Sequence, residues 1–344
     1  MGRDPCEVCI VGGGIAGSTL AHQLAPNFDV CVIEKEGLDQ VGRKPCPGAV
    51  EKSWFEGLPS PVELGAVSRR VKGMKLTAGR KTHQVNFDGY VIDRNKFCRS
   101  LLETGIGEGC ELIKERARAD FKGGKIRVTA GGGRIDADIY VDASGSSAVL
   151  RKHYLPNRRE MFALGCMETI KGEHDSGELD IHLLNHQETS WIFPAENSTN
   201  LGYVTTETSE GKFLGRLKSL KRRLGLEDSK VLVRGYGLIP SHRPIELVHD
   251  NVVAIGDAGF TINPVTCGGI GPSIATARML AESLKDDGLG EFESRYWRNL
   301  GKKFQKLHQI NRVLRKGWLP IWWAVRAYYS DNSISKLIKQ LLRL

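Results

Sequence analysis

A glycine-rich turn between an apolar run and a helix-forming run constrains the fold of this chain most. Residues 6–11 read Cys-Glu-Val-Cys-Ile-Val, typical of a buried strand, and Gly-Gly-Gly-Ile-Ala-Gly follows. In a GxGxxG motif the first glycine permits a tight turn, the second admits a pyrophosphate, and the third lets the helix pack on the strand. We therefore predict a dinucleotide site. The residues expected to contact the ligand are Gly12, Gly14, Ala16 and Gly17.

A carboxylate after the next apolar run narrows the choice of ligand. Val30 to Ile33 form that run, and Glu34 ends it 22 residues after Gly12. A carboxylate at this distance accepts hydrogen bonds from ribose hydroxyls and disfavours a 2′-phosphate. The ligand is therefore expected to be FAD or NAD rather than NADP, with Glu34 and Lys35 at its adenosine end.

A second glycine-rich segment lies near the other end of the chain. The apolar run 251–255 leads into Gly256-Asp257, and a helix is expected after Gly271. A carboxylate at a strand end is suited to hold a ribityl hydroxyl, and a glycine-rich helix start presents backbone N–H groups to a phosphate or a flavin ring. The residues expected to contact the ligand are Asp257, Gly268, Gly269 and Ile270.

Together, these segments resemble the FAD-dependent oxidoreductases with a para-hydroxybenzoate-hydroxylase-type fold, and among them the geranylgeranyl reductase family. The resemblance runs from Val8 to about Leu284. It implies an α/β fold: a discontinuous, glutathione-reductase-like Rossmann domain that binds FAD, a substrate domain built on an antiparallel sheet, and a C-terminal helical segment. The expected bounds are 1–68, 91–150 and 247–285 for the FAD domain, 69–90 and 151–246 for the substrate domain, and 286–344 for the tail.

The resemblance also assigns residues near the flavin. Residues 43–49 read Arg-Lys-Pro-Cys-Pro-Gly-Ala and are similar to the family's cysteine-containing loop at the isoalloxazine ring. The loop residues expected to contact FAD are Arg43, Cys46, Pro47 and Gly48. Arg94, at an expected helix start, would hold the diphosphate.

Two further segments complete the expected FAD domain. Residues 111–120 read as one strand, whose backbone at Ala117 would border the adenine. Residues 139–145 resemble the family's strand ending in Ala-Asp-Gly, here Ala-Ser-Gly, with Arg151 shortly after.

An aromatic segment is expected to contact the substrate. Trp191, Phe193 and Pro194 match the end of the family's Pro-x-x-Tyr-x-Trp-x-Phe-Pro motif, whose leading Pro and Tyr are replaced in this chain. As inward-facing residues of a strand, these aromatics would serve both as core and as cavity wall.

The resemblance implies a reductase that saturates isoprenoid C=C bonds of archaeal-type membrane lipid precursors by flavin hydride transfer plus protonation. Cys46 is the candidate proton donor, and bound water is the alternative because a thiol is a weak acid. The chain holds one dinucleotide fingerprint. The electron donor is therefore expected to dock transiently, as a reduced nicotinamide, a deazaflavin or a ferredoxin.

Other functions remain open from the sequence. A flavin-dependent monooxygenase or halogenase shares the fold, although Thr189 stands where the halogenase motif has its first Trp. A quinone-reducing electron-transfer flavoprotein would need an iron–sulfur domain, and no cysteine follows Cys267. A basic lipid- or nucleic-acid-binding module would leave the flavin motifs unused.

The net charge of +9 lies entirely in the tail. From Glu291 onward there are twelve Lys and Arg against three Asp and Glu, together with four of the six Trp. This mixture favours an anionic membrane surface over nucleic acid, because the rest of the chain is neutral. Two apolar stripes would either lie on the bilayer or pack on the protein itself. The stripes are Leu300, Phe304, Leu307, Ile310 and Leu314, and then Ile334, Leu337, Ile338 and Leu341.

The eight cysteines indicate a reducing compartment. No secretory signal is recognisable at the start of the sequence, so a cytoplasmic protein, peripheral on the inner face of the cell membrane, is expected. Cys6 and Cys9 form a CxxC, but they lie within an expected strand and no second CxxC follows. No metal site is predicted.

Overall fold

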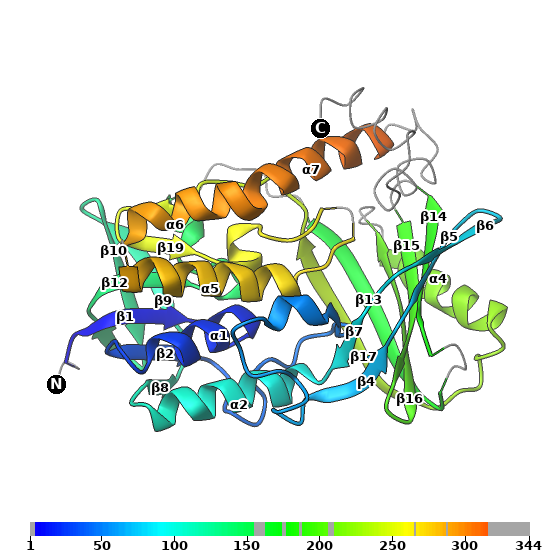
Figure 1. Ribbon diagram of the computed structural model, residues 1–344, viewed down its shortest axis with the longest axis horizontal. Helices are drawn as coiled ribbons and strands as arrows, with labels where there is room; N and C mark the ends of the chain where they lie inside the picture. The colour runs from blue at the N-terminus through cyan, green and yellow to red at the C-terminus, as the bar shows by residue number, and fades with distance from the viewer. Residues whose placement is uncertain are drawn as a thin grey trace.

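Two large sheets organise the computed structural model (Figure 1). One sheet has six strands and the other seven, and two three-stranded sheets accompany them. The structure describes residues 4–154, 162–173, 177–185, 188–205, 210–264, 266–286 and 288–315. The second expected tail stripe and three of the four tail tryptophans lie outside the described residues.

The six-stranded sheet carries the glycine turn at its centre. Its first five strands run parallel, and β18 is antiparallel at the edge. Val8 and Ile10 face the helices on one side, whereas Cys9 and Val11 face the opposite side, as the two-residue period of a strand requires. In sheet order the strands are β8 (Glu111–Lys114), β2 (Val30–Glu34), β1 (Cys6–Val11), β12 (Ala137–Asp142), β19 (Val252–Ala254) and β18 (Val248–His249).

Helices cover one face of this sheet and a small sheet covers the other. The helices are α1 (Ile15–Leu24), α2 (Arg94–Gly107) and α5 (Ile270–Asp286), which lie side by side in Figure 1. The small sheet comprises β9 (Arg118–Lys122), β10 (Lys125–Ala130) and β11 (Gly133–Ile135). The short helical turns are η1 (Lys52–Phe55), η2 (Gly145–Ser147), α3 (Arg151–Tyr154) and η3 (Gly256–Gly259).

The expectation of one strand over residues 111–120 is wrong. β8 ends at Lys114 and β9 begins at Arg118, because the chain leaves the parallel sheet there and enters the small antiparallel one. Ala117 lies in the connection and packs, half-buried, on the hydrophobic cluster between the two sheets.

The seven-stranded sheet is antiparallel except at one junction. The expected antiparallel sheet is thus present, and β14 and β5 are its one parallel pair among the described residues. The β5–β6 hairpin comes from a distant part of the chain and adds to the edge next to β14, so no short turn dictates its direction. In sheet order the strands are β17 (Val231–Pro240), β13 (Phe162–Lys171), β16 (Ser198–Thr205), β15 (Glu188–Ala195), β14 (Leu179–Asn185), β5 (Met74–Ala78) and β6 (Lys81–Val85).

The two faces of this sheet have different neighbours. α4 (Glu210–Arg223) covers one face, where Leu217 packs with Cys166 and Leu201. On the other face, Phe193 packs with Val91 of the third sheet. That third sheet comprises β3 (Ala49–Glu51), β7 (Gly89–Ile92) and β4 (Val67–Val71), and it joins the two large sheets.

The C-terminal helices pack on the protein. α6 (Leu289–Tyr296), the π-helical turn η4 (Trp297–Gly301) and α7 (Lys302–Arg315) follow one another across the helical layer (Figure 1). Leu300, Phe304 and Leu307 are buried in the main hydrophobic core, so this part of the first tail stripe faces the protein itself. Among the described residues, no helix has both the length and the apolar composition needed to cross a membrane.

We predict that Gly17→Ala lowers the free energy of unfolding by at least about 3 kcal/mol, because its Cβ would overlap the Gly12 carbonyl oxygen in a packed interior. Urea denaturation measures this loss. Gly14→Ala is the matched control, because a Cβ at Gly14 meets no atom within 4 Å and its φ of −66° suits alanine. The control should lose less than about 1 kcal/mol. Equal losses in both variants would contradict the close approach of α1 to β1.

Candidate functional site

The glycine turn has room for a Cβ atom at Gly14 but not at Gly12 or Gly17. Gly12 has a φ of 104°, and a Cβ there would lie 2.6 Å from the Ala143 carbonyl oxygen. Gly17 has no room for a Cβ, whereas Gly14 faces open space. Because α1 begins at Ile15, the unpaired backbone N–H groups of its first turn lie at this opening. The turn is therefore suited to an anionic group next to Gly14.

Glu34 is tied to the same turn. Its buried carboxylate accepts hydrogen bonds from the backbone N–H groups of Gly13, at 2.7 Å, and Glu36, at 3.0 Å. A carboxylate offers about four lone-pair positions, so Glu34 keeps capacity for further donors such as ribose hydroxyls. Lys35, in contrast, is exposed and forms an ion pair with Glu36 at 3.5 Å.

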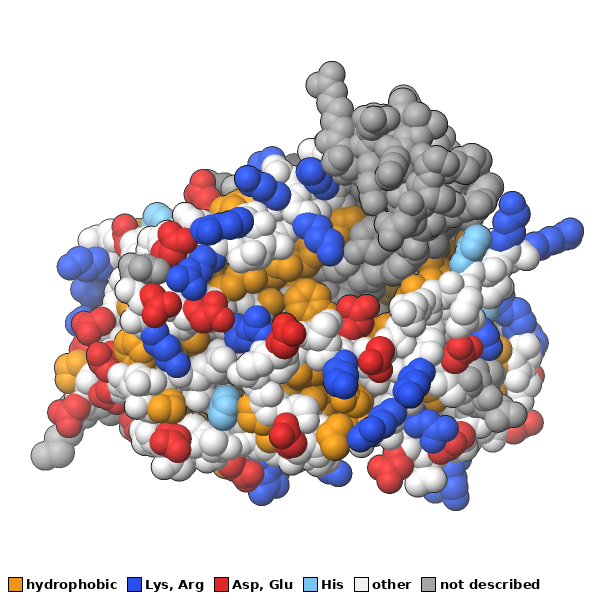
Figure 2. All heavy atoms as spheres, viewed as in Figure 1, with side chains coloured by type: hydrophobic (Ala, Val, Ile, Leu, Met, Phe, Trp, Pro, Cys, Tyr) orange, Lys and Arg blue, Asp and Glu red, His pale blue; other side chains and the backbone are white. Residues whose placement is uncertain are grey.

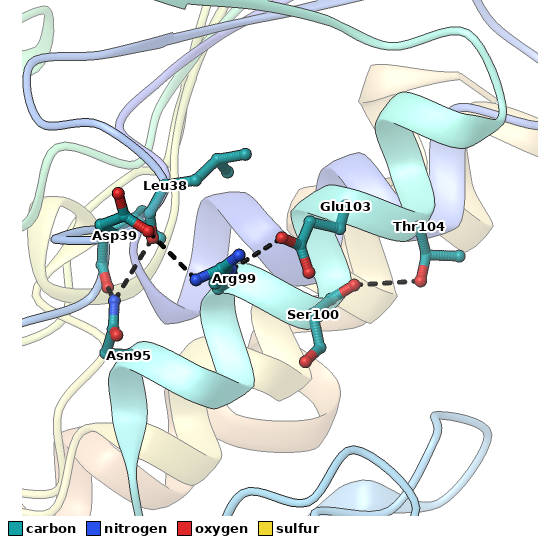
Figure 3. A network of polar contacts seen from close by, with 8 residues as sticks. Leu38, Asp39, Asn95, Arg99, Ser100, Glu103 and Thr104 are labelled. Carbon is teal, nitrogen blue, oxygen red and sulfur yellow. Dashed lines mark hydrogen bonds and ion pairs between the residues drawn. The ribbon is translucent and has the colours of Figure 1, made fainter.

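Helix α2 holds the turn that precedes the cysteine-containing loop. The Asn95 side chain donates a hydrogen bond to the Val41 carbonyl oxygen at 2.7 Å. Arg99 joins Asp39 of the turn to Glu103 of the helix, as Figure 3 shows. The loop therefore starts from a fixed position beside the first turn of α2.

The loop is also fixed at both ends by close backbone approaches. Gly42 and Gly48 have φ values of 72° and 81°. A Cβ at Gly42 would lie 2.7 Å from the Cys98 sulfur, and one at Gly48 would lie 2.6 Å from the Ile92 carbonyl oxygen. In between, the Pro45 ring fills the space that a side chain would need at Gly235 of β17. The loop thus lies between α2 and the seven-stranded sheet.

Three charged side chains meet beside Cys46. The Lys44 ammonium lies 2.5 Å from a carboxylate oxygen of Asp257. Burial acts to lower the pKa of Arg94, but Cys46, Cys98 and Asp257 close to the guanidinium outweigh it, and the pKa is raised. The Arg94 Nε atom is buried, and no described residue accepts its hydrogen. The cluster therefore keeps one buried donor without an acceptor among the described residues.

Asp257 is placed by the second glycine-rich segment. η3 begins at Gly256, whose φ of 60° and close approach to Ala16 bring the turn against α1. A Cβ at Gly269 would lie 3.1 Å from an Asp257 carboxylate oxygen, so the start of α5 also borders this carboxylate. The structure thus brings together two glycine-rich segments that are far apart in the sequence.

Arg151 supports this arrangement from the interior. It is 1% exposed, donates through Nε to the Ala258 carbonyl oxygen, and lies over the Phe260 ring. Asp142 accepts hydrogen bonds from the backbone N–H groups of Leu150 and Arg151, both at 2.8 Å. The Ala-Ser-Gly segment and Arg151 therefore hold η3 in place.

Trp191, one of the expected substrate residues, lies on the sheet face that carries Pro45. Gly235, Met167, Gly202 and Trp191 occupy directly opposed positions on four neighbouring strands, so they share this face. The Trp191 indole lies where Gly202 has no side chain, and its Nε1 donates to the Asn200 side chain at 2.8 Å. The indole therefore extends across the sheet toward Met167.

Phe193 and Pro194 differ in how far the structure connects them with the site. Phe193 is buried in the apolar cluster between β15 and the third sheet. Pro194 is buried next to it in β15.

Three residues expected at the cofactor lie outside the cluster around Asp257. Arg43 of the cysteine-containing loop is exposed. At the expected adenosine end, Lys35 is exposed and Ala117 lies in the β8–β9 connection. The sequence reasoning missed Lys44, although it lies in the motif between Arg43 and Pro45. Its basic charge was visible, but its pairing with a carboxylate 213 residues away was not.

These residues fit FAD. The open backbone at Gly14 and the unpartnered Nε of Arg94 suit a diphosphate, and the buried Glu34 carboxylate suits a ribose. Asp257 offers a carboxylate between the glycine turn and the cysteine-containing loop, where a ribityl chain would run.

Comparison with known proteins agrees with this fold. A family model described as an NAD(P)-binding Rossmann-like domain matches residues 10–39. A digeranylgeranylglycerophospholipid reductase of Sulfolobus acidocaldarius is 25% identical, with 90% of this chain and 77% of the relative aligned. The chain thus resembles the geranylgeranyl reductase family over most of its length.

Solved structures share the architecture. A geranylgeranyl bacteriochlorophyll reductase-like protein of Thermoplasma acidophilum superposes with a TM-score of 0.78 at 19% identity, covering 92% of this chain and 88% of that protein. A flavin-dependent brominase superposes with a TM-score of 0.75 at 18% identity, covering 99% and 93%. The expected α/β fold with a Rossmann-like domain is confirmed, and FAD is the indicated cofactor.

We predict that Arg94→Met weakens FAD binding about 10- to 100-fold, because a charged hydrogen bond contributes about 1.5 to 3 kcal/mol. Quenching of FAD fluorescence on titration into apoprotein measures the dissociation constant. Arg99→Met is the control, because Arg99 lies on the same helix but forms exposed ion pairs. A dissociation constant that is unchanged by Arg94→Met would exclude Arg94 from the cofactor site.

Proposed function

We propose that this chain is an FAD-dependent reductase that saturates the C=C bonds of geranylgeranyl chains in archaeal-type membrane lipid precursors. One observation carries the proposal: the loop around Cys46 lies between helix α2 and an apolar sheet face bearing Trp191. The similarity to a digeranylgeranylglycerophospholipid reductase over 90% of the chain supports the same substrate class.

The chain's own residues would bind and orient the cofactor. Gly14 and Arg94 would hold the diphosphate, Glu34 the adenosine ribose, and Asp257 the ribityl chain. Of the other loop residues, Pro47 and Gly48 would line the ring, with Gly48 held against Ile92 of β7. Gly268, Gly269 and Ile270 would border it from the start of α5. Reduced FAD supplies the hydride that saturation of an alkene requires.

The apolar sheet face would hold the alkene in a water-poor space. Trp191 is fixed in orientation by Asn200, whose amide nitrogen also donates to Thr169 at 3.1 Å. Phe193 packs between β15 and the third sheet on this face, whereas Pro194, the next residue of the strand, faces the opposite side of the sheet. A rigid wall of this kind favours reaction because it orients the substrate and excludes water.

A proton must reach the carbon next to the one that receives hydride. Cys46 is half-buried, carries a free thiol and lies beside the Arg94 guanidinium. We assign it the role of holding this proton at its sulfur, with a bound water as the alternative. The reductant would dock transiently as a reduced nicotinamide, a deazaflavin or a ferredoxin, because the chain carries one dinucleotide fingerprint.

We predict that the purified protein is yellow and, with reduced flavin under anaerobic conditions, adds two hydrogens to each reduced double bond of a digeranylgeranyl lipid. Mass spectrometry of the lipid product measures this gain. A monooxygenase or halogenase on the same fold would instead require oxygen. Product formed only in the presence of oxygen would contradict the reductase proposal, and a colourless protein that takes up no FAD would favour a binding module.

The same assay tests Cys46. Cys46→Ala should lower turnover about 100-fold if its thiol is the proton donor, since a positioned acid contributes roughly 10²- to 10⁴-fold. Cys110→Ala is the control, because Cys110 is a free thiol beyond the C-terminal end of α2, whereas Arg94 lies at the start of that helix. Unaltered turnover in Cys46→Ala would assign the proton to water.

The basic helical segment supports a peripheral membrane role. Lys302, Lys303 and Lys306 are exposed on α7, on the side away from the buried Phe304 and Leu307. Figure 2 shows basic side chains gathered over the region of α6 and α7. The contact would therefore be electrostatic, because this part of the apolar stripe packs on the protein. An anionic surface would bring polyprenyl lipids to the site.

We predict that reversing these three charges to Glu lowers partitioning onto phosphatidylglycerol-containing vesicles at least about tenfold, since each basic residue contributes about 1 kcal/mol. Co-sedimentation measures the fraction of protein bound to the vesicles, and phosphatidylcholine vesicles, which carry no net charge, serve as the comparison. The matched control reverses Lys72, Lys122 and Lys125, which are exposed elsewhere. Equal binding by both triple variants would contradict a role for α7.

A further inference from the structure

We propose that Lys44 raises the reduction potential of bound FAD. Its ammonium group would do so by stabilising reduced, anionic FAD over oxidised FAD. The inference rests on the proposed function only for the presence of FAD in the site. Lys44 lies in the loop that also carries Cys46.

The first observation is the position of the charge. Lys44 Nζ lies 2.5 Å from Asp257, and the two side chains are 33% and 17% exposed. Asp257 in turn borders Gly269 at the start of α5. The ammonium group therefore lies on the inner side of the loop, toward the segments that would enclose the ribityl chain and the flavin ring.

The second observation is the charge balance of the cluster. Lys44 and Arg94 contribute two positive charges and Asp257 contributes one negative charge, so the three side chains together carry one positive charge. Partly buried charges are screened weakly by salt, so this excess acts on whatever occupies the space between them. Since the Nε of Arg94 has no acceptor among the described residues, the cluster is incomplete without an anionic ligand.

The third observation is that the Lys44 backbone has little freedom to move. Pro45 is wedged against Gly235, and the loop ends are held by Gly42 against Cys98 and by Gly48 against Ile92. A lysine on a mobile loop would relax away from a change of charge in the site. Here the loop is held at both ends and the ammonium is paired with Asp257, so the charge is positioned beside the site.

Reduction of the flavin adds a negative charge, so a positive charge nearby affects its reduction potential. Two electrons and one proton, supplied in a titration by dithionite and water, convert the neutral oxidised isoalloxazine into a reduced monoanion. A fixed positive charge nearby stabilises the anion and leaves the neutral form almost unaffected. The site therefore binds reduced FAD more tightly than oxidised FAD, and the difference in affinity appears as a raised potential.

The experiment measures the reduction potential of bound FAD by equilibration with a reference dye, without any lipid substrate. Lys44→Met should reduce the preference for reduced FAD about tenfold, equal to about 30 mV for a two-electron couple. Lys44→Arg should stay within about threefold of the unmodified protein. Lys96→Met is the matched control, because Lys96 is exposed on the helix that carries Arg94 and should leave the potential unchanged.

Asp257→Asn separates a charge effect from damage to the site. Removing the negative charge should shift the potential upward, opposite to Lys44→Met, whereas general loosening of the site would move both variants in one direction. A shift of the same sign in both, or no shift in Lys44→Met with FAD still bound, would overturn this inference and leave the reductase proposal standing. A protein that binds no FAD would overturn both.

Discussion

The close approach of helix α1 to strand β1 is the constraint on which the rest of the site depends. Gly17 lies against the Gly12 carbonyl oxygen, and no larger residue fits there. This contact brings the first turn of α1 to the carboxyl end of the parallel sheet, where its free N–H groups face open space at Gly14. The Glu34 carboxylate is bonded to the same turn, so the adenosine and diphosphate ends of the site share one rigid frame.

The expected flavin end of the site is held by short segments whose charged side chains contact one another. Helix α2, η3 and the loop around Cys46 come from three parts of the chain, and Arg94, Asp257 and Lys44 are the side chains that join them. Close approaches at Gly42, Gly48 and Gly256 position the segments that carry them, and Arg151 supports η3 from beneath. Such preorganised charges act more strongly in a partly dry site than in water, because little reorganisation is needed when the ligand's charge changes.

The apolar side of the site depends on the seven-stranded sheet. Because directly opposed residues share a face, Gly235 and Gly202 leave room in one row for Pro45 and for the Trp191 indole. The loop and the sheet therefore meet with no thick layer of side chains between them. The C-terminal helices pack on the main hydrophobic core through their apolar residues. Their basic side chains are therefore the ones that face an external surface.

Local patterns in the sequence determined the glycine turn, the position of Glu34 and the helix start at Arg94, because these depend on contacts within a few tens of residues. Several such patterns along the chain together carried the likeness to FAD-dependent reductases. Tertiary structure alone decided the rest. The pairing of Lys44 with Asp257 spans 213 residues, β5 joins β14 in parallel, and the strand expected over residues 111–120 divides between two sheets. Periodicity gives a residue's face but not the neighbour that covers it, so only the packed chain shows that Leu300, Phe304 and Leu307 are buried against the protein.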